Sequence, residues 1–395
     1  MLASVLVLLL AVAAPAAPPL LSLVAADGEI GGTIQATATL SDSPDATGEI
    51  VFDVFGPGDA SCSTTGQALE PKPVSGEGEY VSAAFAPTAA GVYSWSAHYS
   101  GDEPADSPCA TSNVAKASPT LTGSASAATA GATIHDEASL SGGFSPTGEV
   151  TFSVYAPTDT GCSTPLATGS ATLQGGAARS ADYLPPQAGD FRWTAAYPGD
   201  ANNEAASTAC NLAGQTSVVA KASPTLSGLA TSAVVVGQPI TDAVTVSAGF
   251  AAGGELLFRA YGPADPDCSG APAYEQAVSV NGDGTYAPAG FAPGPGLYRW
   301  TVGYGGDANN EAADLACGAG NQASAVGTIA VTLKVSASGG TVGNPVAATA
   351  TIAEGATPGG QITFKAFPPA DATCAGAPAF STTLAVAGNG TYTSA

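Results

Sequence analysis

The sequence predicts an all-β chain built of tandem β-sandwich domains, and three observations support this prediction. Cysteine and tryptophan residues recur along the chain at intervals of 98–107 residues. Apolar and polar residues alternate within each interval, as they do in strands with one buried face. Gly, Pro, Asp and Asn interrupt the chain about every 8–12 residues. Several short strands at this spacing are typical of a sandwich.

The chain begins with a predicted targeting segment. Residues 2–12 form a continuous apolar run, which is too short to span a bilayer and suits the core of a signal peptide. The small residues of Ala14-Pro15-Ala16 fit a cleavage site, although the segment lacks the usual positive charges. We therefore predict a signal peptide at 1–16 and an extracellular or cell-surface protein. A buried strand or an uncleaved anchor is the alternative.

An internal repeat organises the rest of the chain. The first cysteines of the repeats are spaced by 100, 106 and 106 residues, and the second by 101 and 107. The repeats are predicted at 17–116, 117–221, 222–328 and 329–395. The fourth ends before a tryptophan strand and a second cysteine, so we interpret it as incomplete. The first cysteines are Cys62, Cys162, Cys268 and Cys374, and the second are Cys109, Cys210 and Cys317.

Recurrent phrases predict where the strands lie. In the phrase T-G-E-V-T-F-S-V-Y, the residues Val150, Phe152 and Val154 fall on one face. The phrase G-x-[YF]-x-W-x-x-x-Y alternates in the same way and recurs at 91–99, 189–197 and 296–304. Its tryptophans are therefore the predicted core anchors: Trp95, Trp193 and Trp300.

The cysteines predict one disulfide in each complete repeat. The two cysteines of a repeat lie 47, 48 or 49 positions apart, and an even number per unit in a secreted protein implies a bond. Closing such a loop stabilises a domain by roughly 4 kcal/mol. Cys374 is left unpaired, and an intermolecular bond is the alternative for its thiol. The predicted pairs are Cys62–Cys109, Cys162–Cys210 and Cys268–Cys317.

Two phrases resemble a known family. The sequences P-T-G-E-V-T-F at 146–152 and A-x-Y-x-G-D-A-N-N at 195–203 are similar to the bacterial Ig-like repeat of the group 3 type. The cysteine pair and the tryptophan depart from the common form of that family. The resemblance implies immunoglobulin-like sandwiches in a surface or secreted array. It also implies a structural or adhesive role without a shared enzymatic activity.

Charge and histidine content exclude several functions. Nine Lys and Arg residues stand against 32 Asp and Glu residues, for a net charge of −23. Binding to nucleic acid or to an anionic membrane needs a basic surface, so neither is expected. His98 and His135 lie at different repeat positions without a neighbouring nucleophile, and we expect both at exposed strand positions. We therefore predict a protein that is not an enzyme and has no cofactor.

The G-D-A-N-N-E phrase is the one candidate for a metal site. Its carboxylate and amide oxygens suit Ca²⁺, but the same residue types form tight turns. We favour the turn. Similarly, the phrase V-N-G-D-G-T-Y at 280–286 predicts a hairpin turn rather than a phosphate loop. The candidate calcium ligands are Asp200, Asn202, Asp307 and Asn309.

Three functions stay open at this point. The first is a structural spacer or stalk, since the Pro-containing junctions at Ser118-Pro119 and Ser223-Pro224 predict semi-rigid linkage. The second is an adhesin whose loops bind an extracellular glycan or protein partner. The third is an accessory region of an exported enzyme whose catalytic domain lies outside this chain.

Overall fold

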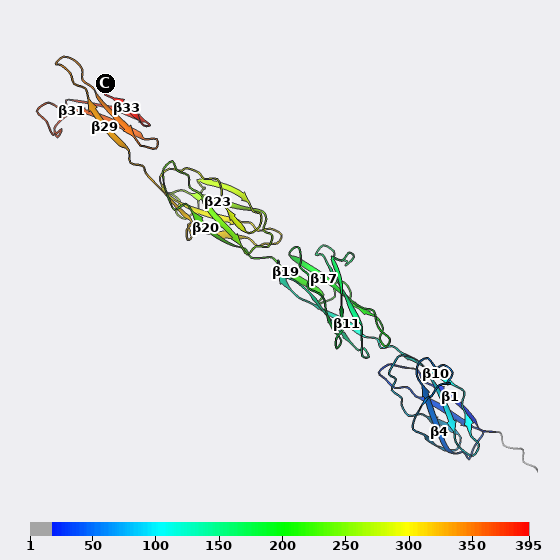
Figure 1. Ribbon diagram of the computed structural model, residues 1–395. Coiled ribbons are helices and arrows are strands. Elements are labelled where there is room, and N and C mark those ends of the chain that lie inside the picture. Colours follow the sequence, from blue (N-terminus) through cyan, green and yellow to red (C-terminus); the bar gives the residue numbers. More distant parts are fainter. Residues whose placement is uncertain (1–17, 395) are drawn as a thin grey trace, which may run out of the picture. The chain divides into compact units, whose positions relative to one another are not determined.

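The computed structural model describes residues 18–394, in which every regular element is a β-strand (Figure 1). The predicted signal peptide therefore lies outside the described residues. Within 18–394, no helix long and apolar enough to cross a membrane is found. These residues form two compact units. Within 18–394, the first comprises residues 18–128, Ala132–Pro185 and Gly189–Val219, and the second comprises Thr129–Gly131, Pro186–Ala188 and residues 220–394.

Repeat 1 is a sandwich of a three-stranded and a seven-stranded sheet. The smaller sheet has the order β1-β3-β7, with strands Leu20–Ala25, Ala36–Ser41 and Gly78–Val81. The larger has the order β2-β10-β8-β4-β5, and β6 and β9 pair with β4 and β8. Its strands are β2 Gly28–Glu29, β4 Thr47–Phe55, β5 Gln67–Ala68, β6 Lys72–Ser75, β8 Gly91–Tyr99, β9 Ala105–Asp106 and β10 Ala110–Ala115.

Repeat 2 has the same plan and lies mostly in the first unit. Its smaller sheet has the order β11-β13-β16, with strands Thr120–Ala125, Asp136–Ser141 and Ala177–Arg179. Its larger sheet has the order β12-β19-β17-β14-β15, and β18 pairs with β17. These strands are β12 Ala128–Thr129, β14 Glu149–Tyr155, β15 Ala167–Thr172, β17 Gly189–Tyr197, β18 Ala206–Ser207 and β19 Thr216–Ala220.

Repeat 3 repeats the arrangement within the second unit. The smaller sheet has the order β20-β22-β25, with strands Thr225–Ala230, Asp242–Ser247 and Gly284–Tyr286. The larger has the order β21-β28-β26-β23-β24, and β27 pairs with β26. Its strands are β21 Ala233–Val235, β23 Glu255–Tyr261, β24 Tyr274–Ser279, β26 Gly296–Tyr304, β27 Ala313–Leu315 and β28 Ala323–Gly327.

Repeat 4 is smaller than the other three. The strands β29, β30 and β33 form one sheet, and β31 and β32 form a two-stranded second sheet. The strands are β29 Thr332–Ala337, β30 Ala348–Ala353, β31 Gly359–Ala366, β32 Phe380–Ala387 and β33 Gly390–Thr393. The first three repeats are therefore full sandwiches, and the described part of the fourth repeat holds fewer strands.

The core of each full sandwich lies where the alternation places it. In repeat 2, the side chains of Val150, Phe152 and Val154 are at most 2% exposed, as is that of Trp193. The three tryptophans are all buried, and each indole N–H donates to a buried serine on the neighbouring strand, over 3.0–3.1 Å. These pairs satisfy the one polar group that each indole brings into the core. They are Trp95–Ser112, Trp193–Ser217 and Trp300–Ser324.

One predicted hairpin is wrong. The phrase at 280–286 follows β24, which pairs with β23, and leads into β25, which pairs with β22 in the other sheet. The turn therefore carries the chain across the sandwich between its two sheets. A turn that joins two strands of one sheet and a turn that crosses between two sheets use the same residue types. The packing of the core, rather than the turn, therefore decides which strand the following strand pairs with.

Candidate functional site

The predicted cysteine pairs are bonded in the structure. The three disulfides join Cys62 to Cys109, Cys162 to Cys210 and Cys268 to Cys317, with sequence separations of 47, 48 and 49 residues. Cys374 is a free, exposed thiol. Each bond joins the loop after the T-G-E strand to the loop that follows the tryptophan strand.

The first cysteine of each repeat lies in a loop that an aspartate closes. In repeat 1, the Asp59 carboxylate accepts bonds from the Thr64 hydroxyl at 2.7 Å and the Thr64 N–H at 2.8 Å. These donors hold the pKa of Asp59 well below its usual range, the Thr64 side chain most strongly. The loop of Cys374 has the same form, because Asp371 accepts the N–H of Gly376 at 2.7 Å. The loop therefore forms with or without its disulfide.

The G-D-A-N-N-E phrase of repeat 2 forms a loop around the Asp200 carboxylate. The backbone N–H groups of Asn202 and Asn203 donate to Oδ1 at 2.8 and 2.9 Å, and the Asn203 amide adds a third bond at 2.8 Å. The N–H and hydroxyl of Thr147 donate to Oδ2 at 2.8 and 3.1 Å. Burial raises the pKa of Asp200, but these donors outweigh it and hold the pKa well below its usual range.

Asn203 anchors this loop to the rest of the sandwich. Its side chain is fully buried, and it exchanges two hydrogen bonds with the backbone of Phe144, at 2.7 and 3.0 Å. A buried amide that is satisfied in this way fixes the loop conformation, since losing either partner strands a buried polar group.

The loop binds the linker that precedes its own repeat. The N–H of Ala117 donates to the carbonyl of Asn202, and the N–H of Glu204 donates to the carbonyl of Ala117, both at 2.9 Å. The Lys116 ammonium donates to the carbonyl of Asp200 at 2.6 Å. Ala117 is only 3% exposed. We call this arrangement the linker clamp; it lies wholly within the first unit.

The second unit contains the same clamp. Asp307 accepts five hydrogen bonds, from Gly253, Tyr304, Asn309 and two groups of Asn310, over 2.6–3.1 Å. The N–H of Ala222 donates to the carbonyl of Asn309 at 2.8 Å, and the backbone N–H of Glu311 donates to the carbonyl of Ala222 at 2.9 Å. The Lys221 ammonium donates to the carbonyl of Asp307 at 2.6 Å.

These bonds argue against the calcium interpretation of the phrase. Both oxygens of Asp200 and of Asp307 already face N–H or O–H donors, which a bound cation would have to displace. The Asn202 side-chain oxygen accepts the N–H of Ala90 at 2.9 Å. Within 18–394, no group of three or more His, Cys, Asp or Glu side chains is placed to hold a metal ion. In the structure, these residues form a hydrogen-bonded loop around each aspartate.

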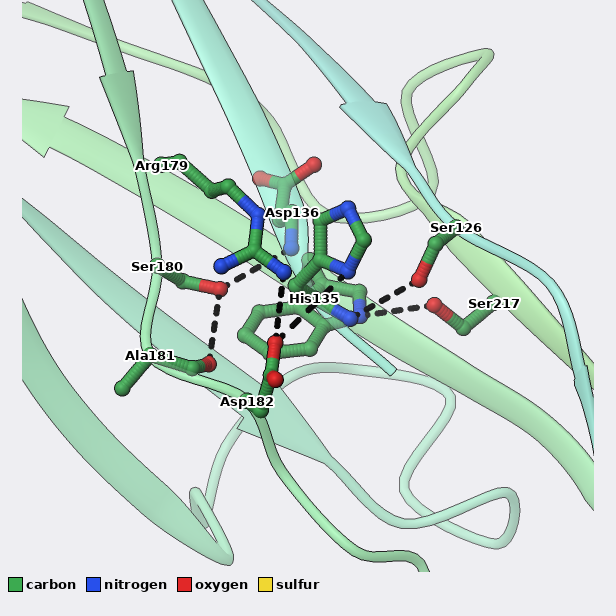
Figure 2. Close-up of polar contacts among 9 residues, drawn as sticks. Ser126, His135, Asp136, Arg179, Ser180, Ala181, Asp182 and Ser217 are labelled. Carbon is green, nitrogen blue, oxygen red and sulfur yellow. Dashed lines mark hydrogen bonds and ion pairs between the residues drawn. The ribbon is translucent and has the colours of Figure 1, made fainter. Parts of the chain in front are cut away.

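The two histidines lie in different repeats. His98 is on β8 with an exposed side chain, and its Nδ1 lies 2.7 Å from the Asp106 carboxylate. His135 differs from the expectation of an exposed strand position, because it precedes β13 and its side chain is only 27% exposed. Its Nδ1 lies 3.8 Å from Asp182, which also binds Arg179 at 2.6 Å (Figure 2).

A buried polar pair escaped the sequence reasoning. Asp136 is fully buried in repeat 2, and its Oδ1 accepts the Gln215 amide at 2.8 Å, whereas Oδ2 has no partner. Burial raises the pKa of Asp136 to about 6, although the Gln215 bond opposes it. In repeat 3, Asp242 and Gln322 form the same pair at 3.0 Å, and burial raises the pKa of Asp242 to about 6.

A glycine makes room for each glutamine. A Cβ atom on Gly123 would lie 1.8 Å from the Gln215 amide nitrogen, and one on Gly228 would lie 2.0 Å from that of Gln322. The strand registers place Leu23 and Ala36 of repeat 1 where repeat 2 has Gly123 and Asp136. The signal that could have found the pair is therefore a joint change of residues between repeats, not a local motif.

The chain has weak similarity to solved structures. No protein-family model matches the chain, and no curated protein matches it. Among solved structures, Escherichia coli alpha-2-macroglobulin activated by porcine elastase is similar at 11% identity and a TM-score of 0.21, over 95% of this chain and 41% of that one. Red sea bream transglutaminase is similar at 13% identity and a TM-score of 0.24, over 52% and 32%.

A Salmonella alpha-2-macroglobulin reacted with methylamine is similar at 12% identity and a TM-score of 0.18, over 96% of this chain and 27% of that one. The chain thus spans less than half the length of each of these proteins. The three disulfides point to an oxidising, extracytoplasmic environment. The order of its sheets makes the chain an all-β array of tandem immunoglobulin-like domains.

Proposed function

We propose that the chain is a non-enzymatic spacer array of an exported bacterial protein, in which clamped linkers hold successive domains. The order of its repeated phrases, similar to bacterial Ig-like repeats of the group 3 type, supports a surface or secreted setting. An accessory role beside a catalytic domain of the same protein is compatible with a spacer.

The linker clamp is the observation that carries this proposal. Strand β10 ends at Ala115, and the next two residues are already bound by the loop of repeat 2. No free residue therefore separates the last strand of repeat 1 from the clamp. A linker without free residues has little conformational freedom to lose or gain, which is what a spacer requires.

Charge and chemistry support the same role. A net charge of −23 keeps a chain of domains soluble and self-repelling. The buried carboxylates of Asp136 and Asp242 face the sandwich interiors rather than a cleft. His98 and His135 are each placed beside an aspartate in separate repeats. None of these groups has the geometry of a nucleophile with a positioned base.

Trypsin cleavage of the full chain tests the clamp at two matched sites. Trypsin cuts after Lys116 and Lys221, and both side chains are held by the clamps. We expect both sites to be cut far more slowly in the native chain than in the chain unfolded by denaturant. The variant Asp200→Ala should speed cleavage at Lys116 by at least tenfold and leave Lys221 unchanged. Asp307→Ala should do the reverse, so that each variant controls the other.

Glu204→Ala is the conservative control, because the Glu204 side chain is exposed and only its backbone takes part in the clamp. Cleavage at Lys116 and Lys221 as fast in the native chain as in the unfolded chain would contradict the proposal. So would an Asp200→Ala variant in which cleavage at Lys116 stays slow.

The adhesin hypothesis is favoured by one observation, a pocket found in repeat 2. An array can space domains and also bind a ligand through one of them, so the two functions are compatible. This pocket lies in the sandwich of repeat 2 and does not involve the linkers.

A further inference from the structure

Repeat 2 has a small pocket against its core tryptophan. The cavity has a volume of about 100 Å³ and lies between β15 and the segment that follows β16. Its floor is made by the buried side chains of Phe152, Val154 and Trp193. Exposed residues at its rim include Thr168 and Asp182. The pocket is therefore an apolar hollow that opens to the surface between the two sheets.

Repeat 3 fills the same place with an aromatic ring. The registers set Tyr274 opposite Ala260 and Ala167 opposite Val154, so Tyr274 and Ala167 hold equivalent positions. The Tyr274 ring stacks on Phe291 with centroids 4.5 Å apart and meets Trp300 edge-on at 6.0 Å.

The partners of that ring have counterparts in the repeat 2 pocket. Phe291 pairs with Ile240 and Tyr183 pairs with Ile134, each by an isolated bridge, so they are equivalent. Tyr183 lines the pocket together with Trp193, the counterpart of Trp300. An aromatic ring of repeat 3 thus occupies the space that is open in repeat 2.

Repeat 1 closes the corresponding region with a different residue. Leu69 follows β5 and packs, partly buried, against the core of repeat 1. Its counterpart in repeat 2 is Gly169, and a Cβ atom there would meet nothing within 4 Å. Repeat 2 alone among the three full repeats has small residues at both positions, Ala167 and Gly169. The hollow follows from losing both of these side chains.

We propose that this pocket of repeat 2 is a binding site for a phenol ring. Its lining offers such a ring the contacts that Tyr274 makes in repeat 3, an aromatic face and an aromatic edge. The Tyr274 hydroxyl also lies within hydrogen-bond distance of the Ala289 carbonyl, whose counterpart is that of Ala181 at the pocket rim.

Polar groups at the rim are already held in place. Ser180 donates to the Ala181 carbonyl at 3.1 Å, and Arg179 binds the Asp182 carboxylate at 2.6 Å (Figure 2). The carbonyl of Ala181 keeps a second lone pair for a ligand hydroxyl. The site therefore offers an apolar floor with an acceptor at its edge, which suits a phenol better than a purely aliphatic group.

Titration of the full chain with p-cresol tests the site. Each full repeat holds one tryptophan, so the indole N–H signals of the ¹⁵N-labelled protein report on the repeats separately. We expect p-cresol to shift the Trp193 signal saturably and to leave those of Trp95 and Trp300 in place. We expect 4-methylcyclohexanol, which has the same heavy atoms but a puckered ring, to bind at least tenfold more weakly.

Paired variants exchange the residues that fill this space between the repeats. Ala167→Tyr should fill the pocket and weaken p-cresol binding at least tenfold, and Gly169→Leu, which copies repeat 1, should do the same by another route. Tyr274→Ala should open the equivalent hollow and make the Trp300 signal respond. A dispersed Trp193 signal in the Ala167→Tyr and Gly169→Leu variants, and a dispersed Trp300 signal in Tyr274→Ala, show that the mutated repeat is folded.

Three results would overturn the proposal. They are no response at Trp193, an equal response at all three tryptophans, or a folded Ala167→Tyr variant that still binds. A second ligand, a short peptide with one tyrosine, distinguishes a free phenol from a tyrosine side chain as the natural ligand. Binding of p-cresol without binding of the peptide supports a free phenol as ligand, and tighter binding of the peptide supports a tyrosine on a protein partner.

Discussion

Repeat 1 and repeats 2 and 3 share their strands, tryptophan and disulfide, but they differ at two places. Where repeats 2 and 3 bury an Asp–Gln pair beside a glycine, repeat 1 has Leu23, Ala36 and Ala110. Where repeats 2 and 3 have the G-D-A-N-N-E loop, repeat 1 reads G-D-E-P. The core thus tolerates two interiors, and the linker clamp is present in repeats 2 and 3, the two full repeats whose preceding linker is described.

The difference teaches which features the sandwich itself requires. The buried tryptophan with its serine partner is common to all three repeats, so it belongs to the fold. The buried Asp–Gln pair is optional, since an apolar set replaces it. Replacing a buried polar pair by apolar residues is often neutral or stabilising, whereas removing one partner is costly.

The largest expected effect comes from replacing Gly123 alone and leaving the Asp136–Gln215 pair in place. Gly123→Leu gives repeat 2 the leucine of repeat 1 while Gln215 still fills that space, so the side chains overlap. We expect a loss of about 3 kcal/mol or more from overpacking and from the displaced amide. Denaturant titration, followed by the Trp193 indole signal, measures repeat 2 separately, with Trp95 as internal reference.

The triple variant Gly123→Leu, Asp136→Ala, Gln215→Ala is the matched control. It rebuilds the complete set of repeat 1, so most of the lost stability should return. If the triple variant is no more stable than Gly123→Leu alone, the three positions do not act as a unit and the comparison between repeats fails.

The next effect is a dependence of stability on pH in repeats 2 and 3. The buried carboxyl of Asp136 keeps its proton up to about pH 6, whereas in the unfolded chain it ionises near its ordinary pKa of about 3.9. Between about pH 4 and pH 6, unfolding therefore releases a proton from Asp136. This group should lower the stability of repeat 2 by about 2–3 kcal/mol as the pH rises from about 4 to above 6.

The double variant Asp136→Asn, Asp242→Asn isolates this contribution. From pH 4 to pH 7, repeats 2 and 3 of the variant should gain stability relative to those of the native chain, because Asn does not titrate. Repeat 1, which has Ala36 at this position, should show no such gain. Unfolding curves at the two pH values, read at each indole signal, provide the measurement. A difference that does not change with pH would show that the carboxyls are ionised in the folded state.

The smallest effect separates repeats 2 and 3 from each other. In repeat 2, the Thr208 hydroxyl donates to the Gln215 oxygen at 3.0 Å and accepts the N–H of Ala195 at 2.8 Å. In repeat 3, Leu315 takes that place and the Gln322 oxygen has no partner. Thr208→Val should cost repeat 2 about 1 kcal/mol. Thr208→Ser keeps the hydroxyl and should cost less, as the Trp193 signal would report.

Local patterns were sufficient to predict the repeated architecture. The cysteine spacing predicted the bonded pairs, and the two-residue alternation placed Phe152 and Trp193 in the core, because both depend on neighbours along the strand. The calcium hypothesis and the turn hypothesis could be told apart only by where the Asp200 oxygens point. Residue types alone carry no such direction.

Contacts between distant segments could not be predicted. Gln215 reaches Asp136 across 79 residues, and Lys116 reaches Asp200 across 84. The pocket of repeat 2 depends on two small residues that look unremarkable in the sequence. They gain meaning only when the register shows that Tyr274 and Leu69 hold the same positions.

Amide hydrogen exchange at the two linkers tests the central claim most directly. The N–H groups of Ala117 and Ala222 donate to the carbonyls of Asn202 and Asn309 in the clamps. If the linkers are clamped, both amides should exchange as slowly as strand amides of the flanking repeats, and Asp200→Ala should release Ala117 alone. Exchange of both amides at the rate of an unstructured chain, in the native protein, would contradict the account of a spacer with clamped linkers.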